Sequence, residues 1–223
     1  GYQNDEGAVR VLEWNGSQWE KVALLTPDEP QKGAQFGFSV DVHQDTIIVG
    51  EPYRDDPDGG TRKDVGWAYL FYKDGAEWSD MTQKREYYYD AVWQEGRHLG
   101  YSVAYSNGMG IVGAPGEDVD FGSGNIEDIG MVYLFNPGPT PTKVLTISEY
   151  GNPALDYTRN YQHGYALSID GTTIAASAIG ANGGVGAVYV YEDVHLGGTN
   201  ISETAILTPS DGSSGDSFGD AID

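Results

Sequence analysis

The sequence predicts an all-β fold built from repeated four-stranded antiparallel sheets, and three observations carry this prediction. The 223 residues include 32 glycines and 16 tyrosines, and turn formers beside β-formers favour short strands joined by tight turns. A motif centred on glycine recurs four times along the chain. No segment shows the 3.6-residue apolar period of an amphipathic helix, which excludes a helical solenoid.

The first element of the repeat is an aromatic or apolar residue followed by glycine, and we predict a strand at each copy. The copies are residues 36–40, 99–103, 163–167 and 218–222. Three further elements follow in most repeats, the last of them the most polar. The second elements are 47–52, 111–115 and 174–178; the third are 7–12, 66–71, 130–135 and 186–191; the fourth are 22–27, 83–86, 144–147 and 205–209. Each repeat therefore holds four short strands.

The third element is apolar on both faces, as six consecutive apolar residues at 67–72 illustrate. Alternating polarity would mark a sheet with one solvated face, whereas a continuous apolar run indicates that both faces are covered. Repeated four-stranded sheets with both faces covered are what the blades of a β-propeller require. The sequence therefore predicts a β-propeller.

The repeats divide a single domain into three complete blades and a partial blade at each end. The predicted complete blades are 33–90, 95–148 and 160–209, with partial blades at 1–32 and 210–223. The N-terminal part supplies strands 3 and 4 of a blade, and the C-terminal part supplies only strand 1. We therefore expect the chain to be part of a larger propeller, or its open edge to be completed by another chain.

Three motifs resemble those of a known family. Residues 207–219 read LTPSDGSSGDSFG, residues 112–115 read VGAP, and the third strands approach the pattern G-x-V-Y-x-F. Together they resemble FG-GAP repeats, the blades of integrin-α-type β-propellers, over nearly the whole chain. The resemblance implies a parent propeller of seven blades.

In that family the link between strands 1 and 2 commonly carries a D-x-D-x-D-G calcium loop. Here the links at 41–46, 104–108 and 169–172 are too short and too poor in acid to wrap an ion that needs six to eight oxygens. The chain is therefore similar to the short variant of the repeat, without the calcium loop.

Charge restricts the partners. The chain has 34 Asp and Glu against 12 Lys and Arg, for a net charge of −22. Phosphate binding needs a basic stripe, so nucleic acid is disfavoured as a partner. No stretch approaches the roughly 20 apolar residues of a membrane span, so we expect no membrane insertion. Cations, basic surfaces and neutral sugars suit the charge, although solubility alone explains it equally well.

The candidate ligand site lies on one face of the blades. In an up-and-down blade the 2–3 loops and the 4–1 connectors emerge together, and we call this side the loop face. It carries the longest segments, where function tends to be found. The ligand-face candidates are Asp55, Asp56, Asp58, Tyr87, Tyr88, Tyr89 and Trp93. The tyrosines fit a sugar or protein platform, or else a wedge between blades.

No cofactor is required by any motif, but the acidic loops could hold calcium. The best candidate ligands are Asp118, Asp120 and Asp128, although solvated acidic loops explain these residues as well. On the opposite face, two N-x-S/T sequons at Asn15 and Asn200 each fall in a 3–4 turn. They favour a glycosylated, secreted protein.

Catalytic motifs give little support for an enzyme. The four histidines share no ligand spacing, and the chain has no cysteine. We predict a non-enzymatic extracellular or cell-surface module for recognition, adhesion or structure, with a protein or glycan ligand on its loop face. One alternative is a carbohydrate-binding or carbohydrate-active propeller with paired carboxylates. The other is an assembly unit whose open blade edge pairs with another chain.

Overall fold

The structure is a computed structural model. It describes residues 6–56, 60–73, 78, 83–87, 94–120, 125–135, 143–147, 160–195 and 201–223. The described elements are β1 (Val9–Trp14), β2 (Trp19–Leu25), β3 (Val40–His43), β4 (Thr46–Glu51), β5 (Trp67–Tyr72), β6 (Gln83–Tyr87), β7 (Ser102–Ser106), β8 (Met109–Ala114), β9 (Val119–Asp120), β10 (Asn125–Ile126), β11 (Met131–Phe135), β12 (Lys143–Ile147), β13 (His163–Asp170), β14 (Thr173–Ala178), α1 (Ala181–Gly184), β15 (Ala187–Tyr191) and β16 (Ala205–Leu207).

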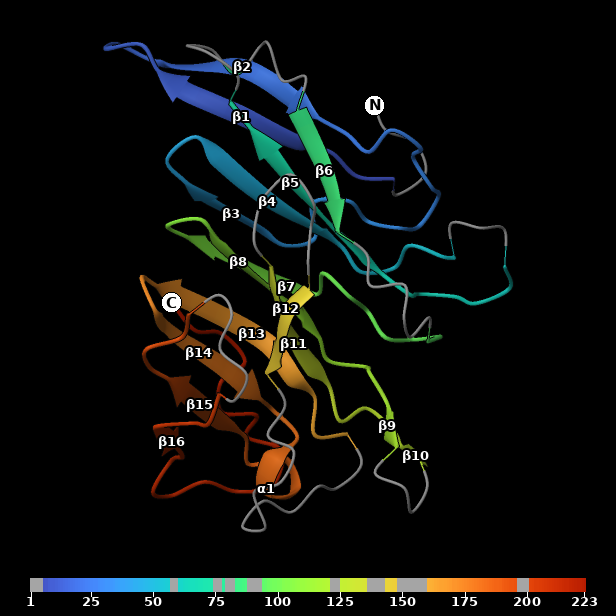
Figure 1. Cartoon of the computed structure of the whole chain (residues 1–223), viewed down its shortest axis with the longest axis vertical. Coiled ribbons are helices and arrows are strands. Elements are labelled where there is room, and N and C mark those ends of the chain that lie inside the picture. The colour runs from blue at the N-terminus through green and yellow to red at the C-terminus, as the bar shows by residue number, and fades with distance from the viewer. Residues whose placement is uncertain are drawn as a thin grey trace.

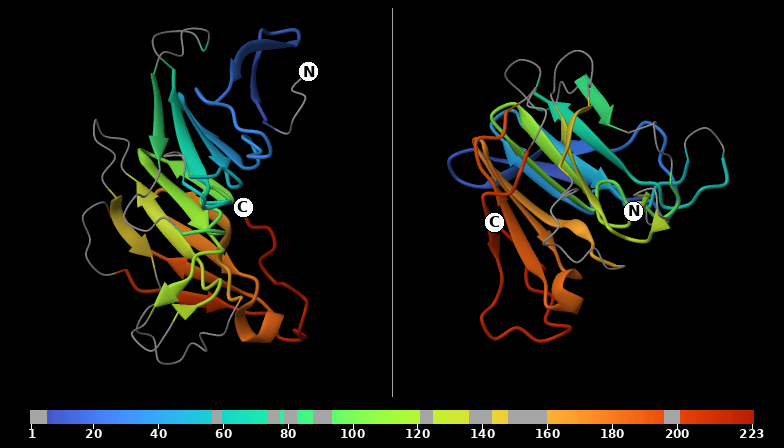
Figure 2. Two further views of the ribbon diagram at one scale, coloured as in Figure 1. Left: turned by 90° about the vertical axis from the view of Figure 1, so that its right-hand side faces the viewer. Right: turned by 60° about the horizontal axis from the view of Figure 1, so that its bottom comes forward.

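Three antiparallel four-stranded sheets follow one another along the chain. Their strand orders are β3-β4-β5-β6, β7-β8-β11-β12 and β13-β14-β15-β16, and the hairpin β1-β2 stands at the N-terminal end. Figure 1 shows the hairpin at the top, followed downwards by the three sheets, and Figure 2 shows the same succession from two other sides. The all-β fold with sheets like propeller blades is confirmed.

The first and second sheets have a buried apolar cluster on each face, as the apolar runs predict. Every residue of β4 and of β8 is buried, and so are the first five residues of β5. Three apolar clusters fill the spaces between successive layers of the structure. One lies between the hairpin and the first sheet, one between the first and second sheets, and one between the second and third. The core is therefore divided among the blade interfaces.

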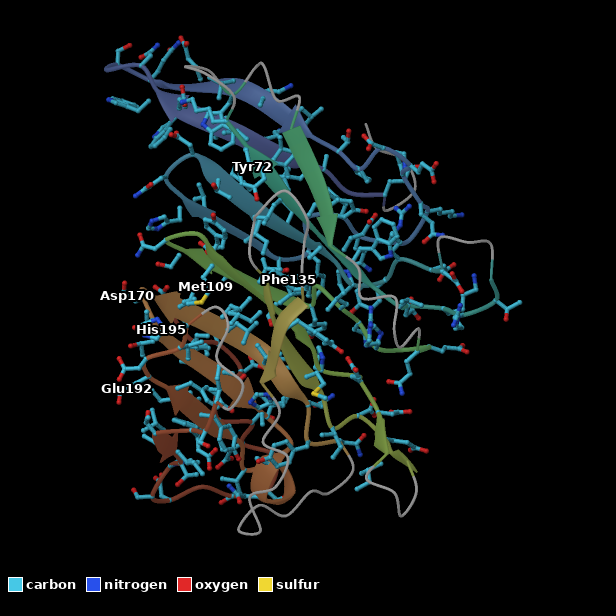
Figure 3. All side chains as sticks on the ribbon, in the orientation of Figure 1. Tyr72, Met109, Phe135, Asp170, Glu192 and His195 are labelled. Carbon is cyan, nitrogen blue, oxygen red and sulfur yellow. The ribbon has the colours of Figure 1, made fainter. Side chains whose placement is uncertain are left out.

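The links between strands 1 and 2 are two-residue turns, shorter than a calcium loop. The β7–β8 turn consists of Asn107 and Gly108, with φ of 47° and 85°, which is the backbone of a type I′ hairpin. The β3–β4 and β13–β14 links are equally short. In Figure 3 the labelled residues Met109 and Asp170 mark this turn side of the molecule, and β9 and β10 lie on the other side.

Successive blades are joined by the same contact four times. A glycine just before each third strand forms an isolated parallel bridge with the residue that precedes the motif glycine of the next repeat. The four bridges are Gly7↔Phe36, Gly66↔Leu99, Gly130↔His163 and Gly186↔Phe218. A Cβ on Gly66 would stand 2.3 Å from the backbone N of Leu99, so only glycine allows this approach.

The first repeated element is not a strand in every copy, which corrects the sequence prediction. β3 begins at Val40 and β7 at Ser102, three residues or more after the bridging residue. At the C-terminus only the bridge at Phe218 forms, and residues 219–223 are not in a strand. The reason is that a strand is defined by its pairing, and residues 219–223 pair with no described strand.

The limits of the predicted blades remain a prediction, because two of them, at residues 90 and 148, fall outside the described ranges.

The helix α1 is four residues long and lies in the third 2–3 loop. Within the described part of the chain, no helix has the length and apolar character to span a membrane.

Candidate ligand-binding site on the loop face

Three aromatic side chains line up across the three complete sheets, each one residue after a motif glycine. They are Phe38, Tyr101 and Tyr165, and we call them the aromatic arc. The ring centroids of Phe38 and Tyr101 are 4.9 Å apart, with planes inclined by 48°. Those of Tyr101 and Tyr165 are also 4.9 Å apart, inclined by 45°. The repeat therefore builds a continuous row of rings from distant parts of the chain.

The blade joint fixes where these rings lie. Gly100 has a φ of +89°, and a Cβ there would be 2.2 Å from the backbone O of Trp67. Its N–H donates to the carbonyl of Gly113 at 3.0 Å. Because neighbouring backbone holds the glycine on both sides, the next residue, Tyr101, leaves the joint at a fixed position. Gly37 and Gly164 have similar φ values of +89° and +84° and place the other two rings in the same way.

Residues from the loop face complete the cluster. Tyr53 belongs to the loop between β4 and β5, and its ring meets Phe38 edge to face at 5.7 Å. Tyr53 also contacts the ring of His98 at 5.2 Å. The arc therefore lies at the loop-face end of the sheets. Phe38 is 43% exposed, and Tyr101 and Tyr165 are half-buried, so the rings can be reached from solvent.

Two carboxylates act on the tyrosines of this cluster, Asp64 on Tyr53 and Asp220 on Tyr101. Burial raises the pKa of Tyr53, and the nearby Asp64 carboxylate and Tyr165 raise it further. The pKa of Tyr101 is raised mainly by burial, then by a hydrogen bond with Tyr165, with a smaller contribution from Asp220. The tyrosines therefore stay neutral at physiological pH, in a negative field. This combination suits a positively charged group.

His98 stands beside this cluster as a neutral ring. Burial lowers its pKa, and the carboxylates of Asp64 and Asp128 oppose that shift only in part. The ring thus adds aromatic surface next to Tyr53 without adding a positive charge that would repel a cation.

A comparison with known families agrees with the geometry. Residues 19–71 match the FG-GAP repeat. The chain contains an FG-GAP repeat. The matched segment runs from β2 to β5, so it includes the bridge residue Phe36 and two rings of the cluster, Phe38 and Tyr53. No curated protein matches the sequence. The resemblance deduced from the motifs is confirmed.

Asp55, a predicted ligand residue within the FG-GAP repeat, forms hydrogen bonds that hold the loop between β4 and β5. Its backbone N–H donates to Gln31 Oε1 at 2.6 Å, and its carboxylate accepts the backbone N–H of Asp64 at 3.2 Å. Lys63 Nζ lies 2.5 Å from the same carboxylate. The neighbouring Asp56 is buried and pairs with the Arg62 guanidinium at 2.5 Å. Both carboxylates therefore bind partners within the repeat.

Asp118 repeats this arrangement one blade later. Its backbone N–H donates to Gln94 Oε1 at 2.6 Å, and its carboxylate accepts the backbone N–H of Asp128 at 2.9 Å. Asp128 has a φ of 52°, as Asp64 has 54° in the preceding repeat. Two successive repeats thus share a structural arrangement, in which an aspartate and a glutamine hold the 2–3 loop.

The structure brings together two of the three predicted calcium ligands. Burial raises the pKa of Asp128, and the carboxylates of Asp118 and Glu127 raise it further. Asp120 lies in β9, opposite Asn125. Among the described residues, no group of three or more acidic or histidine side chains is positioned to hold a metal ion. Calcium binding remains a prediction.

Several other candidates fall outside the described residues. They are Asp58, Tyr88, Tyr89, Trp93 and Asn200. For Tyr87 the structure gives the backbone, at the end of β6 opposite Ala68.

The sequon residue Asn15 is exposed in the β1–β2 turn. Its side-chain carbonyl accepts hydrogen bonds at 2.9 Å from the backbone N–H and the hydroxyl of Ser17. Its amide donates to Glu20 at 2.6 Å. The position is open to solvent, and its glycosylation remains a prediction.

The aromatic arc itself was missed by sequence reasoning. The signal was present, because the residue after the motif glycine is aromatic in three consecutive repeats. The sequence predicts strand interior at these positions, whereas Phe38 and Tyr101 precede β3 and β7 and Tyr165 is the third residue of β13, so the rings lie near the strand ends closest to the loop face.

Proposed function

We propose that this FG-GAP repeat protein is a non-enzymatic recognition module, extracellular or at the cell surface, that binds a cationic side chain of a protein partner. The aromatic arc of Phe38, Tyr101 and Tyr165 is the binding site. The single observation that carries the proposal is that three successive repeats place a reachable ring at the same position, in contact with the next.

The geometry favours a cation over a sugar. Sugar rings stack on a flat aromatic platform, whereas the arc's planes are inclined by 45° to 48°. Inclined rings with carboxylates near them suit an arginine or lysine head, held by cation–π attraction worth about 0.5–2 kcal/mol per contact. The net charge of −22 adds long-range attraction for a basic partner.

The family supports a role in recognition. FG-GAP repeat families are generally non-enzymatic and typically extracellular. The carboxylates Asp55 and Asp56 are engaged with Lys63 and Arg62, whereas the ring of Phe38 is 43% exposed.

The test uses three capped glycine pentapeptides whose central residue is arginine, lysine or glycine. Titration calorimetry with the intact chain should show weak binding of the arginine and lysine peptides and none of the glycine peptide. Tyr101→Ala should abolish the binding. Trp14→Ala, which removes an exposed ring at the far end of β1 (54% exposed), is the matched control and should leave it unchanged. Equal heats for all three peptides would refute the proposal.

A further inference from the structure

Two tyrosines of the aromatic arc meet across the boundary between the second and third blades. The ring centroids of Tyr101 and Tyr165 are 4.9 Å apart, with planes inclined by 45°, and a side-chain hydrogen bond joins the two residues. The ortho carbons of a phenol stand beside its hydroxyl, so this hydrogen bond brings the ortho carbons of both rings to the same contact. These are the carbons at which two oxidised phenols couple.

The backbone holds the two phenols in this contact. Ser102, the residue after Tyr101, donates its hydroxyl to the carbonyl of Gly164, the residue before Tyr165, at 2.6 Å. Strands β7 and β13, which begin at or beside these residues, lie side by side (Figure 1). Both tyrosines are half-buried rather than enclosed. The pair therefore combines a fixed geometry with access from solvent.

A second pair of tyrosines has the contact without the access. The hydroxyls of Tyr161 and Tyr189 touch, and their ring centroids are 6.2 Å apart. Their exposed fractions are only 3% and 1%, which shields them from an oxidant in solution. The chain also has no cysteine, so a disulfide cannot join its blades. An oxidative crosslink within the chain would therefore form between accessible tyrosines.

We propose that Tyr101 and Tyr165 are a site of oxidative crosslinking, which joins the second and third blades by a carbon–carbon bond between the two rings. The reagents are hydrogen peroxide and a haem peroxidase that oxidises phenols one electron at a time. Each hydroxyl loses a hydrogen atom, and the resulting radicals combine at their ortho carbons. The hydrogens on those carbons then move to the oxygens, which restores both phenols. The electrons and protons removed from the pair reduce one hydrogen peroxide to two molecules of water.

The bond should stabilise the fold. Tyr101 and Tyr165 are 64 residues apart along the chain, so a bond between them restricts the unfolded chain strongly. It costs little in the folded chain, where the rings already touch. By analogy with a disulfide that closes a loop of this length, the melting temperature should rise by about 5–10 °C. This inference is independent of the proposed ligand and stands whether or not the arc binds a cation.

The experiment oxidises the intact chain with a haem peroxidase and hydrogen peroxide, isolates the monomer by size exclusion and digests it with trypsin. Trypsin leaves Tyr101 and Tyr165 in separate peptides, residues 98–143 and 160–223. The expected product is these two peptides joined, lighter than their sum by two hydrogen atoms and with the blue fluorescence of coupled tyrosines. Tyr101→Phe and Tyr165→Phe each keep the ring and should abolish this product.

The matched control is Tyr105→Phe. Tyr105 lies in β7, in the same tryptic peptide as Tyr101, and is 7% exposed. Its loss should leave the yield of the joined peptides unchanged. A monomer without the joined peptides overturns the proposal, and so does a joined product that survives Tyr101→Phe. A joined monomer that melts no higher than the unoxidised chain would overturn the stabilising effect.

A relocated pair keeps the test valid if a single variant fails for other reasons. Phe38 contacts Tyr101 from the other side, with ring centroids also 4.9 Å apart. Adding Phe38→Tyr to the Tyr165→Phe chain should create a new joined product, between residues 33–54 and 98–143, that Tyr165→Phe alone does not give. Absence of that product would contradict the dependence of coupling on this ring contact.

Discussion

The hydroxyl of Tyr133 donates to the carboxylate of Glu117 at 2.6 Å, inside the second blade. Both side chains are buried, at 1% and 4% exposure. The same tyrosine position recurs three residues after the joint glycine in every complete blade. In the first blade Tyr69 donates to Glu51, and in the third Tyr189 and Tyr161 share a hydroxyl contact. The partner thus comes from a different position in each repeat, while the buried tyrosine hydroxyl keeps a partner each time.

Removing that hydroxyl should destabilise the second blade. Tyr133→Phe takes a donor from a buried carboxylate, and such losses cost about 1–3 kcal/mol. The free energy of unfolding from urea titration should fall by that amount. Combined with Glu117→Gln, which removes the charge, the loss from Tyr133→Phe should shrink. Equal losses in both backgrounds would show that the pair is not coupled.

The blade joint should be intolerant of any side chain. Gly66→Ala adds a Cβ 2.3 Å from the backbone of Leu99 and also places alanine at a φ of +79°. Gly33→Ala is the matched control, because Gly33 has a φ of +83° with nothing within 4 Å. In Gly33→Ala the free energy of unfolding should fall by about 1–2 kcal/mol, because alanine is strained at a positive φ. Gly66→Ala should lose clearly more, and a similar loss for both variants in urea titration would contradict the role of the joint.

His163 should make the folded state sensitive to acid. It takes the place of the motif phenylalanine and is 3% exposed, and burial lowers its pKa from 6.5 to about 4. The unfolded chain therefore binds a proton in a range where the folded chain does not. Stability contributed by the neutral ring is complete above about pH 6.5 and falls by about 3 kcal/mol towards pH 4.

His163→Phe should remove this loss, because Phe36 fills the same position in the first repeat and does not titrate. Urea titrations at pH 7 and pH 4.5 measure this loss of stability. The difference in unfolding free energy between the two pH values should be smaller in the variant than in the parent chain. An unchanged difference would mean that His163 is not the group responsible.

Asp128 should cost stability when it is ionised. Burial and the carboxylate of Asp118 raise the pKa of Asp128 in the folded state. The ionised form of Asp128 is therefore less favourable in the folded chain than in the unfolded chain. Asp128→Asn should therefore raise the melting temperature at pH 7, with the gain fading as the pH falls through about 4. Asp45→Asn, in the exposed β3–β4 turn, is the control. A loss of stability at pH 7 in Asp128→Asn would contradict the sign of this effect.

Calcium binding by Asp118, Asp120 and Asp128 makes a separate prediction. An ion bound only by the folded chain must raise the melting temperature. Millimolar calcium should then stabilise the parent chain more than Asp128→Asn. Equal melting curves with and without calcium would show that the folded chain does not bind the ion.

The architecture could be predicted because it depends on local patterns that repeat. Glycines at the joints, two-residue hairpins such as Asn107 and Gly108, and continuous apolar runs each specify a strand or a turn without knowledge of the rest. The start of strand 1 was harder to place. The motif pair looks like a strand in sequence, but Gly37 and Gly100 have positive φ and serve the joint between blades.

The site was less predictable because it depends on which residues meet across blades. Acidic residues such as Asp55 and Asp118 looked available for a ligand, yet their partners Gln31 and Gln94 lie 24 residues away along the chain. Conversely, Phe38 and Tyr101 are 63 residues apart and become neighbours only through the stacking of two sheets.

The most direct test of cation binding at the aromatic arc is the proton spectrum of an arginine side chain in the presence of the protein. Rings that surround a guanidinium shift the neighbouring δ-methylene protons upfield. With the capped arginine peptide, we expect a saturable upfield shift of those protons that is lost in both Phe38→Ala and Tyr101→Ala and kept in Trp14→Ala. Arginine protons that do not move on addition of the protein, or that move equally with all three variants, would contradict it.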